Sequence, residues 1–167
     1  MDQKLENFAA ECNRILKSDP GPSGLEAVSR KLEPLLLDAD FVDTYLGPDN
    51  VTQRTVLYED SELGFCILAH VYKDASSAPP HDHGPAWAIY GQVKGETEMT
   101  EYDLITPPAD GEPGQVKASK SYILKPGMAV AYPKGALHAP KREDETRLIR
   151  MEGQNLTGVK RDKFELA

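Results

Sequence analysis

The sequence has few cysteines, few histidines and no long run of apolar or basic residues. Its 167 residues include two cysteines and four histidines, and Lys or Arg residues never occur more than two in a row. The 27 acidic residues outnumber the 19 basic ones, which gives a formal net charge of −8. This balance disfavours a protein that binds along nucleic-acid phosphates. Since no stretch of about 18 apolar residues and no signal-peptide core occurs, we expect a cytoplasmic protein without a membrane segment.

The two cysteines indicate neither a disulfide framework nor a zinc site. Cys12 and Cys66 lie far apart, each in an apolar stretch, and neither belongs to a CxxC pair. We expect two buried thiols in a reducing compartment. A chain of this length can bury a core without such cross-links, so residues 1–167 are predicted to form one domain.

Residues 1–46 have the pattern of a helical layer. Apolar side chains recur every three or four residues, first from Leu5 to Leu16 and again from Leu25 to Leu32, which gives each helix one apolar stripe. Pro34 either kinks the second helix or begins a further one.

From residue 52 the sequence changes to short β-branched and aromatic runs separated by Gly, Pro and Asp. Seven segments have the length of strands: 52–59, 63–72, 86–93, 96–105, 115–124, 128–133 and 146–152. Their regular spacing is typical of an antiparallel sandwich or barrel. The predicted fold class is therefore mainly β, with a barrel over 52–155 and an N-terminal helical layer over 1–46.

Three of the four histidines occur in two β segments flanked by turn residues. His81 and His83 are two residues apart, so on an extended strand both imidazoles point to the same side. A third ligand is expected from His138, and neutral imidazoles suit iron, nickel, copper or zinc. An HxH pair by itself also occurs without a metal. His70, in an apolar strand, is interpreted as a structural residue or an outer partner of the site.

Two segments resemble the cupin motifs. HDHGPAWAIYGQVKG contains the HxH pair and a closing Gly95, and GMAVAYPKGALHAPKR matches the second motif through its Gly, Pro-Lys-Gly and His138 spacing. The resemblance implies a double-stranded β-helix, or jelly-roll, barrel with His81, His83 and His138 as metal ligands. Where cupins usually carry a glutamate as fourth ligand, this chain has Trp87 or Ala88, which implies a site without a carboxylate ligand.

Within the cupins, the absence of that carboxylate and the helical layer are similar to cysteine dioxygenase-type thiol dioxygenases. The resemblance implies an Fe(II) site that takes a small thiol acid and O2, with Ni or Zn as alternative metals. It also implies that Arg54 pairs with the substrate carboxylate, and Arg54 shares a strand face with Val56 and Tyr58 in a period-two reading. The alternative is a surface arginine on an edge strand.

Another feature of that family is missing. The strand that should carry its Ser-x-His-x-Tyr relay reads TRLIRMEGQN, where Arg150 and Glu152 either take similar places or face solvent. Three tyrosines are candidate hydroxyl donors, namely Tyr58, Tyr90 and Tyr132. Together with Arg54, Tyr58 and Tyr132 form the predicted catalytic set.

Two other functions remain open from the sequence. The same site could serve a non-thiol cupin enzyme, for diketone cleavage, isomerisation or hydrolysis with another metal, or a non-catalytic cupin that binds a small ligand or a metal. In each case the expected partner is a small molecule, with no nucleic acid and no membrane. The chain is expected to be a monomer or a homodimer.

Overall fold

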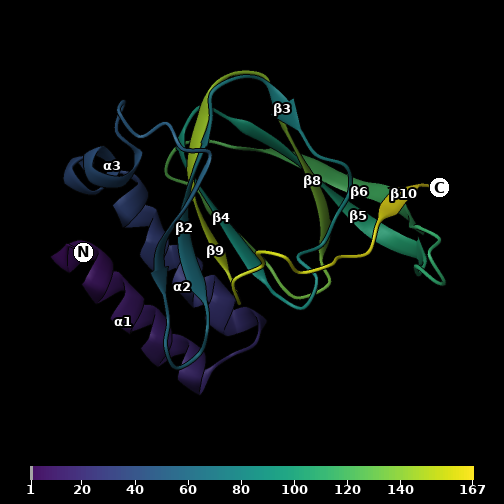
Figure 1. Cartoon of the computed structure of the whole chain (residues 1–167), viewed down its shortest axis with the longest axis horizontal. Helices are drawn as coiled ribbons and strands as arrows, with labels where there is room; N and C mark the ends of the chain where they lie inside the picture. Colours follow the sequence, from purple (N-terminus) through teal and green to yellow (C-terminus); the bar gives the residue numbers. More distant parts are fainter. Residues whose placement is uncertain (1) are drawn as a thin grey trace.

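Two facing β-sheets, with three helices packed on the outer side of one of them, form the molecule (Figure 1). The computed structural model describes residues 2–167. The helices are α1 (Gln3–Ser18), α2 (Pro22–Leu36) and α3 (Ala39–Leu46). The strands are β1 (Arg54–Glu59), β2 (Cys66–Tyr72), β3 (Ser76–Ser77), β4 (Ala88–Lys94), β5 (Thr97–Thr106), β6 (Gly114–Leu124), β7 (Ala129–Tyr132), β8 (Leu137–Arg142), β9 (Thr146–Glu152) and β10 (Phe164–Leu166).

Each sheet has five strands. The helix-covered sheet has the order β1-β2-β9-β4-β7, and the second sheet has the order β10-β6-β5-β8-β3. Neighbouring strands are antiparallel except for the parallel pair β10 and β6. The predicted architecture is confirmed: the chain is mainly β, with two facing sheets and an N-terminal helical layer.

Side-chain caps mark the starts of two helices. The carboxylate of Asp2 accepts a hydrogen bond from the Leu5 amide before α1, and Asp38 does the same for Phe41 before α3. Pro34 lies in the last turn of α2, which ends two residues later, and the next helix begins only at Ala39. The proline therefore neither begins a new helix nor divides a long one. No helix within residues 2–167 has the length and apolar character needed to cross a bilayer.

The main apolar core lies between the helices and the helix-covered sheet. Leu32 and Leu36 of α2 pack so closely over Gly91 that a Cβ there would lie 2.9 Å from a methyl of each leucine. Glycine at this position thus permits the close approach of helix and strand. Both cysteines are free and buried, as expected, with Cys12 in this core.

Strand alternation places several polar side chains on the other face of this sheet. The residues that point away from the helices include four on neighbouring strands: His70 on β2, Arg150 and Glu152 on β9, and Tyr90 on β4. Tyr90 lies directly opposite Arg150, and Ala88 lies directly opposite Glu152. Because directly paired residues project from the same side of a sheet, these side chains all enter the space between the two sheets.

Candidate metal centre and its pocket

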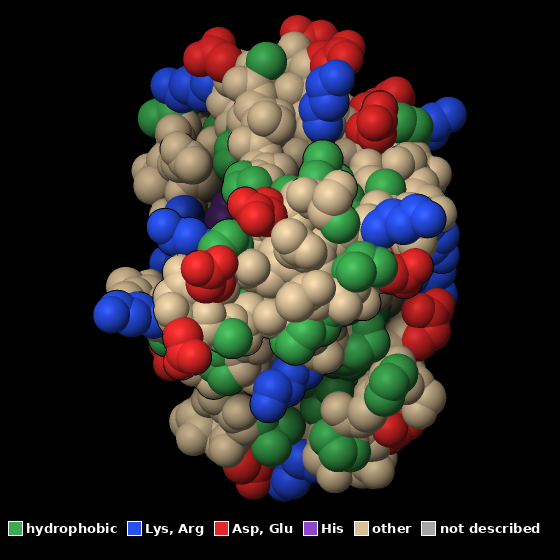
Figure 2. Space-filling view, turned by 90° about the vertical axis from the view of Figure 1, so that its right-hand side faces the viewer, with side chains coloured by type: hydrophobic (Ala, Val, Ile, Leu, Met, Phe, Trp, Pro, Cys, Tyr) green, Lys and Arg blue, Asp and Glu red, His purple; other side chains and the backbone are tan. Residues whose placement is uncertain are grey.

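Three of the four histidines meet between the sheets. One ligand nitrogen from each of His81, His83 and His138 lies within 4.8 Å of the others. His81 and His138 face each other across an isolated bridge and exchange both backbone hydrogen bonds, each 3.0 Å long. His83 forms its own single bridge to Ala86, so the HxH pair lies in short bridges and not in a regular strand. Figure 2 shows a histidine at the bottom of a recess in the surface.

The outer nitrogen of each imidazole faces a hydrogen-bond acceptor. The Nδ1 atoms lie 2.8 Å from the Pro79 carbonyl for His81, 3.0 Å from Glu152 Oε2 for His83, and 3.2 Å from the Ala136 carbonyl for His138. A carbonyl or an ionised carboxylate can only accept, so each neutral imidazole carries its proton on Nδ1. The three Nε2 atoms are left with lone pairs. Outer partners of this kind typically orient histidines that bind metals.

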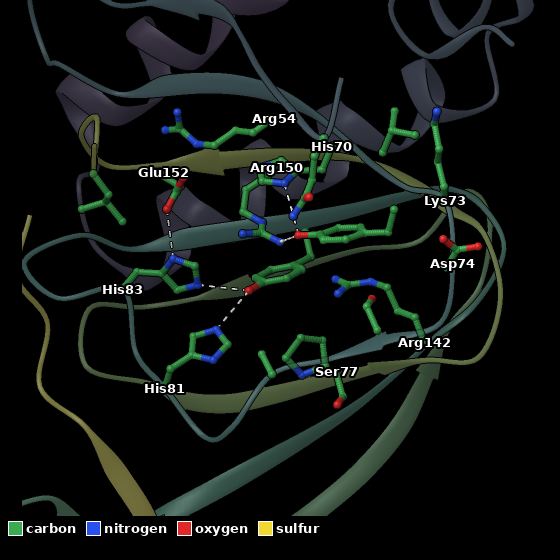
Figure 3. Close-up of a pocket in the computed structure, with 18 of the residues that line it drawn as sticks. Arg54, His70, Lys73, Asp74, Ser77, His81, His83, Arg142, Arg150 and Glu152 are labelled. Carbon is green, nitrogen blue, oxygen red and sulfur yellow. Dashed lines mark hydrogen bonds and ion pairs between the residues drawn. The ribbon is translucent and has the colours of Figure 1, made fainter. Parts of the chain in front are cut away.

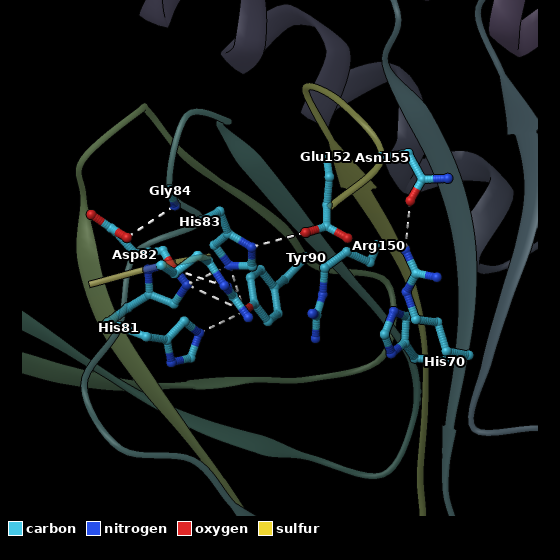
Figure 4. A network of polar contacts seen from close by, with 12 residues as sticks. His70, His81, Asp82, His83, Gly84, Tyr90, Arg150, Glu152 and Asn155 are labelled. Atoms are coloured by element: carbon cyan, nitrogen blue, oxygen red, sulfur yellow. Dashed lines mark hydrogen bonds and ion pairs between the residues drawn. The ribbon is translucent and has the colours of Figure 1, made fainter. Parts of the chain in front are cut away.

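The three Nε2 atoms converge on one point. His83 Nε2 lies 3.1 Å from His138 Nε2, although neither atom has a proton to share. The Tyr90 hydroxyl lies 3.1 Å, 3.2 Å and 3.5 Å from the Nε2 atoms of His83, His138 and His81 (Figure 4). Its single proton can satisfy one of the three lone pairs. A divalent cation would satisfy all three, so the donor set fits a metal ion.

Burial keeps these imidazoles in the form that binds metals. Desolvation is the largest effect on each ring, and it lowers the pKa of His81 to about 4 and that of His138 to about 2. Desolvation also lowers the pKa of His83, against the opposing effect of its hydrogen bond to Glu152. All three side chains are therefore neutral near pH 7, and no proton has to leave before a metal binds.

The position at which the sequence lacks the expected carboxylate offers no ligand atom in the structure either. Of the two residues considered there, Trp87 packs against the main core, and Ala88 is buried. Its cross-strand partner Glu152 directs its carboxylate to His83 Nδ1 (Figure 4). Burial acts to raise the pKa of Glu152, but the hydrogen bond from His83 and the charge of Arg150 lower it overall. Glu152 is thus ionised and holds a ligand in place.

A cavity of about 1080 Å³ opens beside the histidines. Its walls come from β1 and β2, from the segment around β3, from β8 and β9, and from the chain that follows β9 (Figure 3). Five cationic side chains line it, against two carboxylates: Arg54, Lys73, Arg142, Arg150 and Arg161 against Asp74 and Glu152. The cavity therefore has a positive charge balance, and a divalent metal would increase it.

Arg54 lies at the rim of this cavity. It is exposed and sits opposite His70 on the neighbouring strand. Its guanidinium donates to Thr157 Oγ1 at 3.3 Å and to Asn155 Oδ1 at 3.5 Å, both in the segment after β9. The structure therefore brings Arg54 to the pocket, and its pairing with a substrate stays a prediction.

Tyr58 does not share the face of Arg54. A β-bulge between Val56 and Tyr58 shifts the register, so that Val56 pairs with Leu68 but Tyr58 pairs with Ile67. The extra residue turns Tyr58 toward the helices, where its hydroxyl donates to Asp60 at 2.8 Å. The period-two reading of this strand was wrong at this position, because alternation fails across a bulge. Tyr58 is not among the residues that line the cavity.

Tyr132 lies next to the histidines, with its hydroxyl directed elsewhere. Its ring stacks on His138 at a centroid distance of 4.1 Å, and its hydroxyl pairs with that of Tyr122. The tyrosine hydroxyl that reaches the Nε2 atoms belongs to Tyr90. Nothing in the sequence distinguished Tyr90 from Tyr58 and Tyr132 as the tyrosine whose hydroxyl contacts the histidines.

Sequence reasoning missed Tyr72 and Arg142. The Arg142 guanidinium lies 4.2 Å above the centre of the Tyr72 ring, and both residues line the cavity. A signal for Arg142 was present, since His138 and Arg142 are four residues apart and so share a face of one strand. That signal required a strand over 137–142, which is not among the seven predicted segments.

Comparison with known proteins gives matches among solved structures alone. No family model and no curated protein sequence matches the chain. A cupin-2 domain containing protein from Shewanella frigidimarina has 12% identity over 72% of this chain and 96% of its own, with a TM-score of 0.46. KdgF from Halomonas sp. has 16% identity over 59% and 76%, with a TM-score of 0.44. A cupin superfamily protein from Desulfitobacterium hafniense has 14% identity over 59% and 72%, also with 0.44.

Proposed function

We propose that this chain is a metal-dependent enzyme whose metal is held by His81, His83 and His138. One observation carries the proposal: three Nε2 lone pairs face one point, and the Tyr90 hydroxyl offers them a single proton. Without a bound cation this arrangement would leave buried lone pairs facing one another without compensation. The adjoining cavity gives a small molecule access to that point.

For the reaction we propose oxidation of a small thiol acid with O2, in the manner of a thiol dioxygenase. Three neutral imidazoles leave a divalent metal with its full charge, which favours an anionic ligand such as a thiolate. When bound, iron(II) would supply the dioxygen chemistry. The cationic cavity favours a substrate that also carries a carboxylate.

The chain's own residues would position the substrate and handle protons. Glu152 fixes the His83 ring, and the Tyr90 hydroxyl lies where it can donate a hydrogen bond to a group beside the three nitrogens. Arg54 at the rim is one candidate anchor for a carboxylate. Arg150 and Glu152 both face the cavity, on the strand that carries the Ser-x-His-x-Tyr relay in the family.

A second candidate is a non-thiol cupin enzyme acting on a larger acid. The cavity of about 1080 Å³ slightly exceeds the usual range for small-molecule sites, roughly 300–1,000 Å³. A thiol acid of a few carbons would leave much of it to water. The missing relay also favours this reading, with nickel or zinc as the metal in place of iron.

Metal analysis and oxygen uptake separate these functions. Protein purified without air or chelators should contain one iron per chain and consume oxygen with cysteine or 3-mercaptopropionate. Ethanethiol, which lacks a carboxylate, should be a much poorer substrate. Stoichiometric zinc or nickel with no oxygen uptake would favour the second candidate, and no bound metal would contradict both.

Arg54→Lys tests the predicted anchor within the same assay. Lysine keeps the positive charge but loses the planar two-pronged donor, so an anchor at this position requires a higher KM for thiol acids at normal metal content. The loss of one charge-assisted hydrogen bond corresponds to roughly a tenfold or greater weakening. An unchanged KM would remove Arg54 from substrate binding.

A further inference from the structure

Five buried side-chain atoms within residues 2–167 have no hydrogen-bond partner, and all belong to residues that line the cavity. They are His70 Nε2, Ser76 Oγ, Arg142 Nε, Arg142 Nη2 and Arg150 Nε. Buried polar atoms are normally paired, because an unpaired one costs roughly 1–3 kcal/mol. Their concentration in one cavity indicates a site built for a ligand, since random packing defects would be scattered over the chain.

Three of the five atoms are arginine nitrogens, which can only donate. Arg142 and Arg150 are 4% and 9% exposed, and an arginine cannot lose its charge inside a protein. Burial lowers the pKa of His70 to about 2, so its ring is neutral and has one proton. If Nδ1 accepts from the Tyr72 hydroxyl, at 3.2 Å, the proton lies on Nε2 and points into the cavity. An acceptor-rich, negatively charged group would satisfy these donors.

Two tyrosines hold the arginines in place. The Arg142 guanidinium lies 4.2 Å over the Tyr72 ring, and the Arg150 guanidinium lies 4.2 Å over the Tyr90 ring. Arg150 also donates to the Tyr72 hydroxyl at 3.4 Å. Figure 3 shows Arg142 and Arg150 extending into the same space from different strands. The donors are therefore oriented before any ligand arrives, which reduces the entropy lost on binding.

The unpaired edge of Arg142 indicates the shape of the anion. Nε and Nη2 are the two N–H groups along one edge of a guanidinium, and that edge matches the two oxygens of a carboxylate. Arg150 Nε and His70 Nε2 are further donors for the outer lone pairs of the same oxygens. Within the described chain the two carboxylates of the cavity do not serve: Glu152 binds His83, and Asp74 is exposed and pairs with neither arginine.

We propose that Arg142 and Arg150, with His70, form a carboxylate subsite beside the metal centre. The hydroxyl of Tyr90 meets the three Nε2 atoms while its ring carries Arg150, so the two sites are separated by about one phenol ring. The ligand class is a small acid with a metal-binding donor, such as a thiol or an enol, a few bonds from its carboxylate. The metal-binding end of this ligand rests on the proposed function, whereas the carboxylate subsite does not.

Binding of simple anions to the full chain tests the subsite without any reaction. Propionate should bind both to metal-loaded protein and to chelated protein, and it should shift the NMR signals of the Arg142 and Arg150 Nε–H groups. Propionamide, which has the same shape without the charge, should do neither. Inorganic phosphate serves as a second anion, because it can also accept from two parallel donors, and phosphate binding tighter than propionate binding would contradict a subsite for a carboxylate.

Variants at three arginines separate this subsite from its alternatives. Arg142→Gln should weaken propionate binding about tenfold or more, and Arg142→Lys should weaken it by less. Arg54→Gln should weaken it by less than Arg142→Gln does, because Arg54 lies at the exposed rim of the cavity. Arg147, on β9, is the matched control, because it is about as buried as Arg142. Its guanidinium lies on the opposite side of the sheet, where it donates to the carbonyls of Leu46, Gly47 and Asn50.

Arg142→Gln and Arg147→Gln should differ in their effect on thermal stability. Without ligand, Arg142→Gln should unfold at the same temperature as the parent or at a higher one, because it removes an unpaired buried charge next to Arg150. Arg147→Gln should unfold at a lower temperature while keeping its propionate affinity. The proposal is overturned if the parent does not bind propionate, or if Arg142→Gln and Arg142→Lys both bind it with the parent's affinity. Propionate binding by a chain that takes up no metal would uphold the subsite and contradict the proposed function.

Discussion

His83 and His138 place their Nε2 atoms 3.1 Å apart, with the Nδ1 atom of each ring facing an acceptor. Two neutral imidazoles in this arrangement direct lone pairs at each other, so the pair is repulsive unless a cation lies between them. Removing the metal should therefore lower the thermal stability of the chain, and adding it back should restore the stability.

The same relationship predicts the effect of removing one ligand. His138→Ala should reduce metal content well below one ion per chain, because two imidazoles cannot hold the ion as three do. The affinity loss should exceed the tenfold to hundredfold that is typical for an outer hydrogen-bond partner. Metal analysis with circular dichroism checks this, since the β-sheet signal should persist. Full occupancy in His138→Ala would show that the ligand set is wrong.

Glu152→Gln tests the role of the carboxylate behind His83. Glutamine can still accept the Nδ1 proton, but it lacks the negative charge that makes the imidazole a better donor to a metal. We expect metal affinity to fall about tenfold to a hundredfold, with His83 in the same orientation. Competition with a chelator of known affinity measures the change. Glu143→Gln, at an exposed glutamate paired only with Lys141, is the matched control and should keep the parent's affinity.

Tyr90→Phe separates proton handling from metal binding. Phenylalanine keeps the ring under Arg150 and removes only the hydroxyl beside the three nitrogens. We expect normal metal content and a kcat for oxygen uptake about a hundredfold lower, in the range typical of a lost general acid or base. Tyr132→Phe removes a hydroxyl that pairs with Tyr122 and should change kcat little. A Tyr132→Phe effect equal to that of Tyr90→Phe would support Tyr132, the catalytic residue predicted from the sequence.

The pattern of β-branched and aromatic runs separated by turn residues located seven strands: β1, β2, β4, β5, β6, β7 and β9. It failed where the chain departs from that pattern. The bulge after Val56 turned Tyr58 to the helix side, and Pro140, within β8, concealed the strand that carries Arg142. β3 and β10, of two and three residues, are too short to give a periodic signal.

The convergence of the three histidines was predictable, whereas their environment was not. The spacing of His81, His83 and His138 fits a known motif, so their convergence could be expected from the sequence. The acceptors at Nδ1 are two backbone carbonyls and one glutamate from another strand, and a carbonyl has no sequence signature. The Arg142 donors are unpaired because no acceptor from another part of the described chain reaches them in the folded structure. A local sequence pattern cannot show this.

His70 gives the chain a pH dependence that is independent of the metal ligands. Burial, reinforced by the charges of Arg150, Arg54 and Arg142, lowers its pKa to about 2, whereas an unfolded histidine titrates near 6.5. Below about pH 6.5 the unfolded chain binds a proton that the folded chain does not, so the free energy of unfolding falls as the pH falls. One such group contributes about 1.4 kcal/mol for each pH unit.

The variant His70→Gln should remove that contribution. Denaturant unfolding of chelated parent and variant at pH 7.5, 6.0 and 5.0 measures the two slopes under conditions in which the other histidines contribute equally. The parent should lose stability more steeply between pH 6.0 and 5.0, by about 1.4 kcal/mol more than the variant. Parallel loss in the two proteins would mean that His70 becomes protonated in the folded state. A protonated ring carries a proton on both nitrogens, so Nδ1 could no longer accept a hydrogen bond from the Tyr72 hydroxyl while Nε2 donates to the cavity.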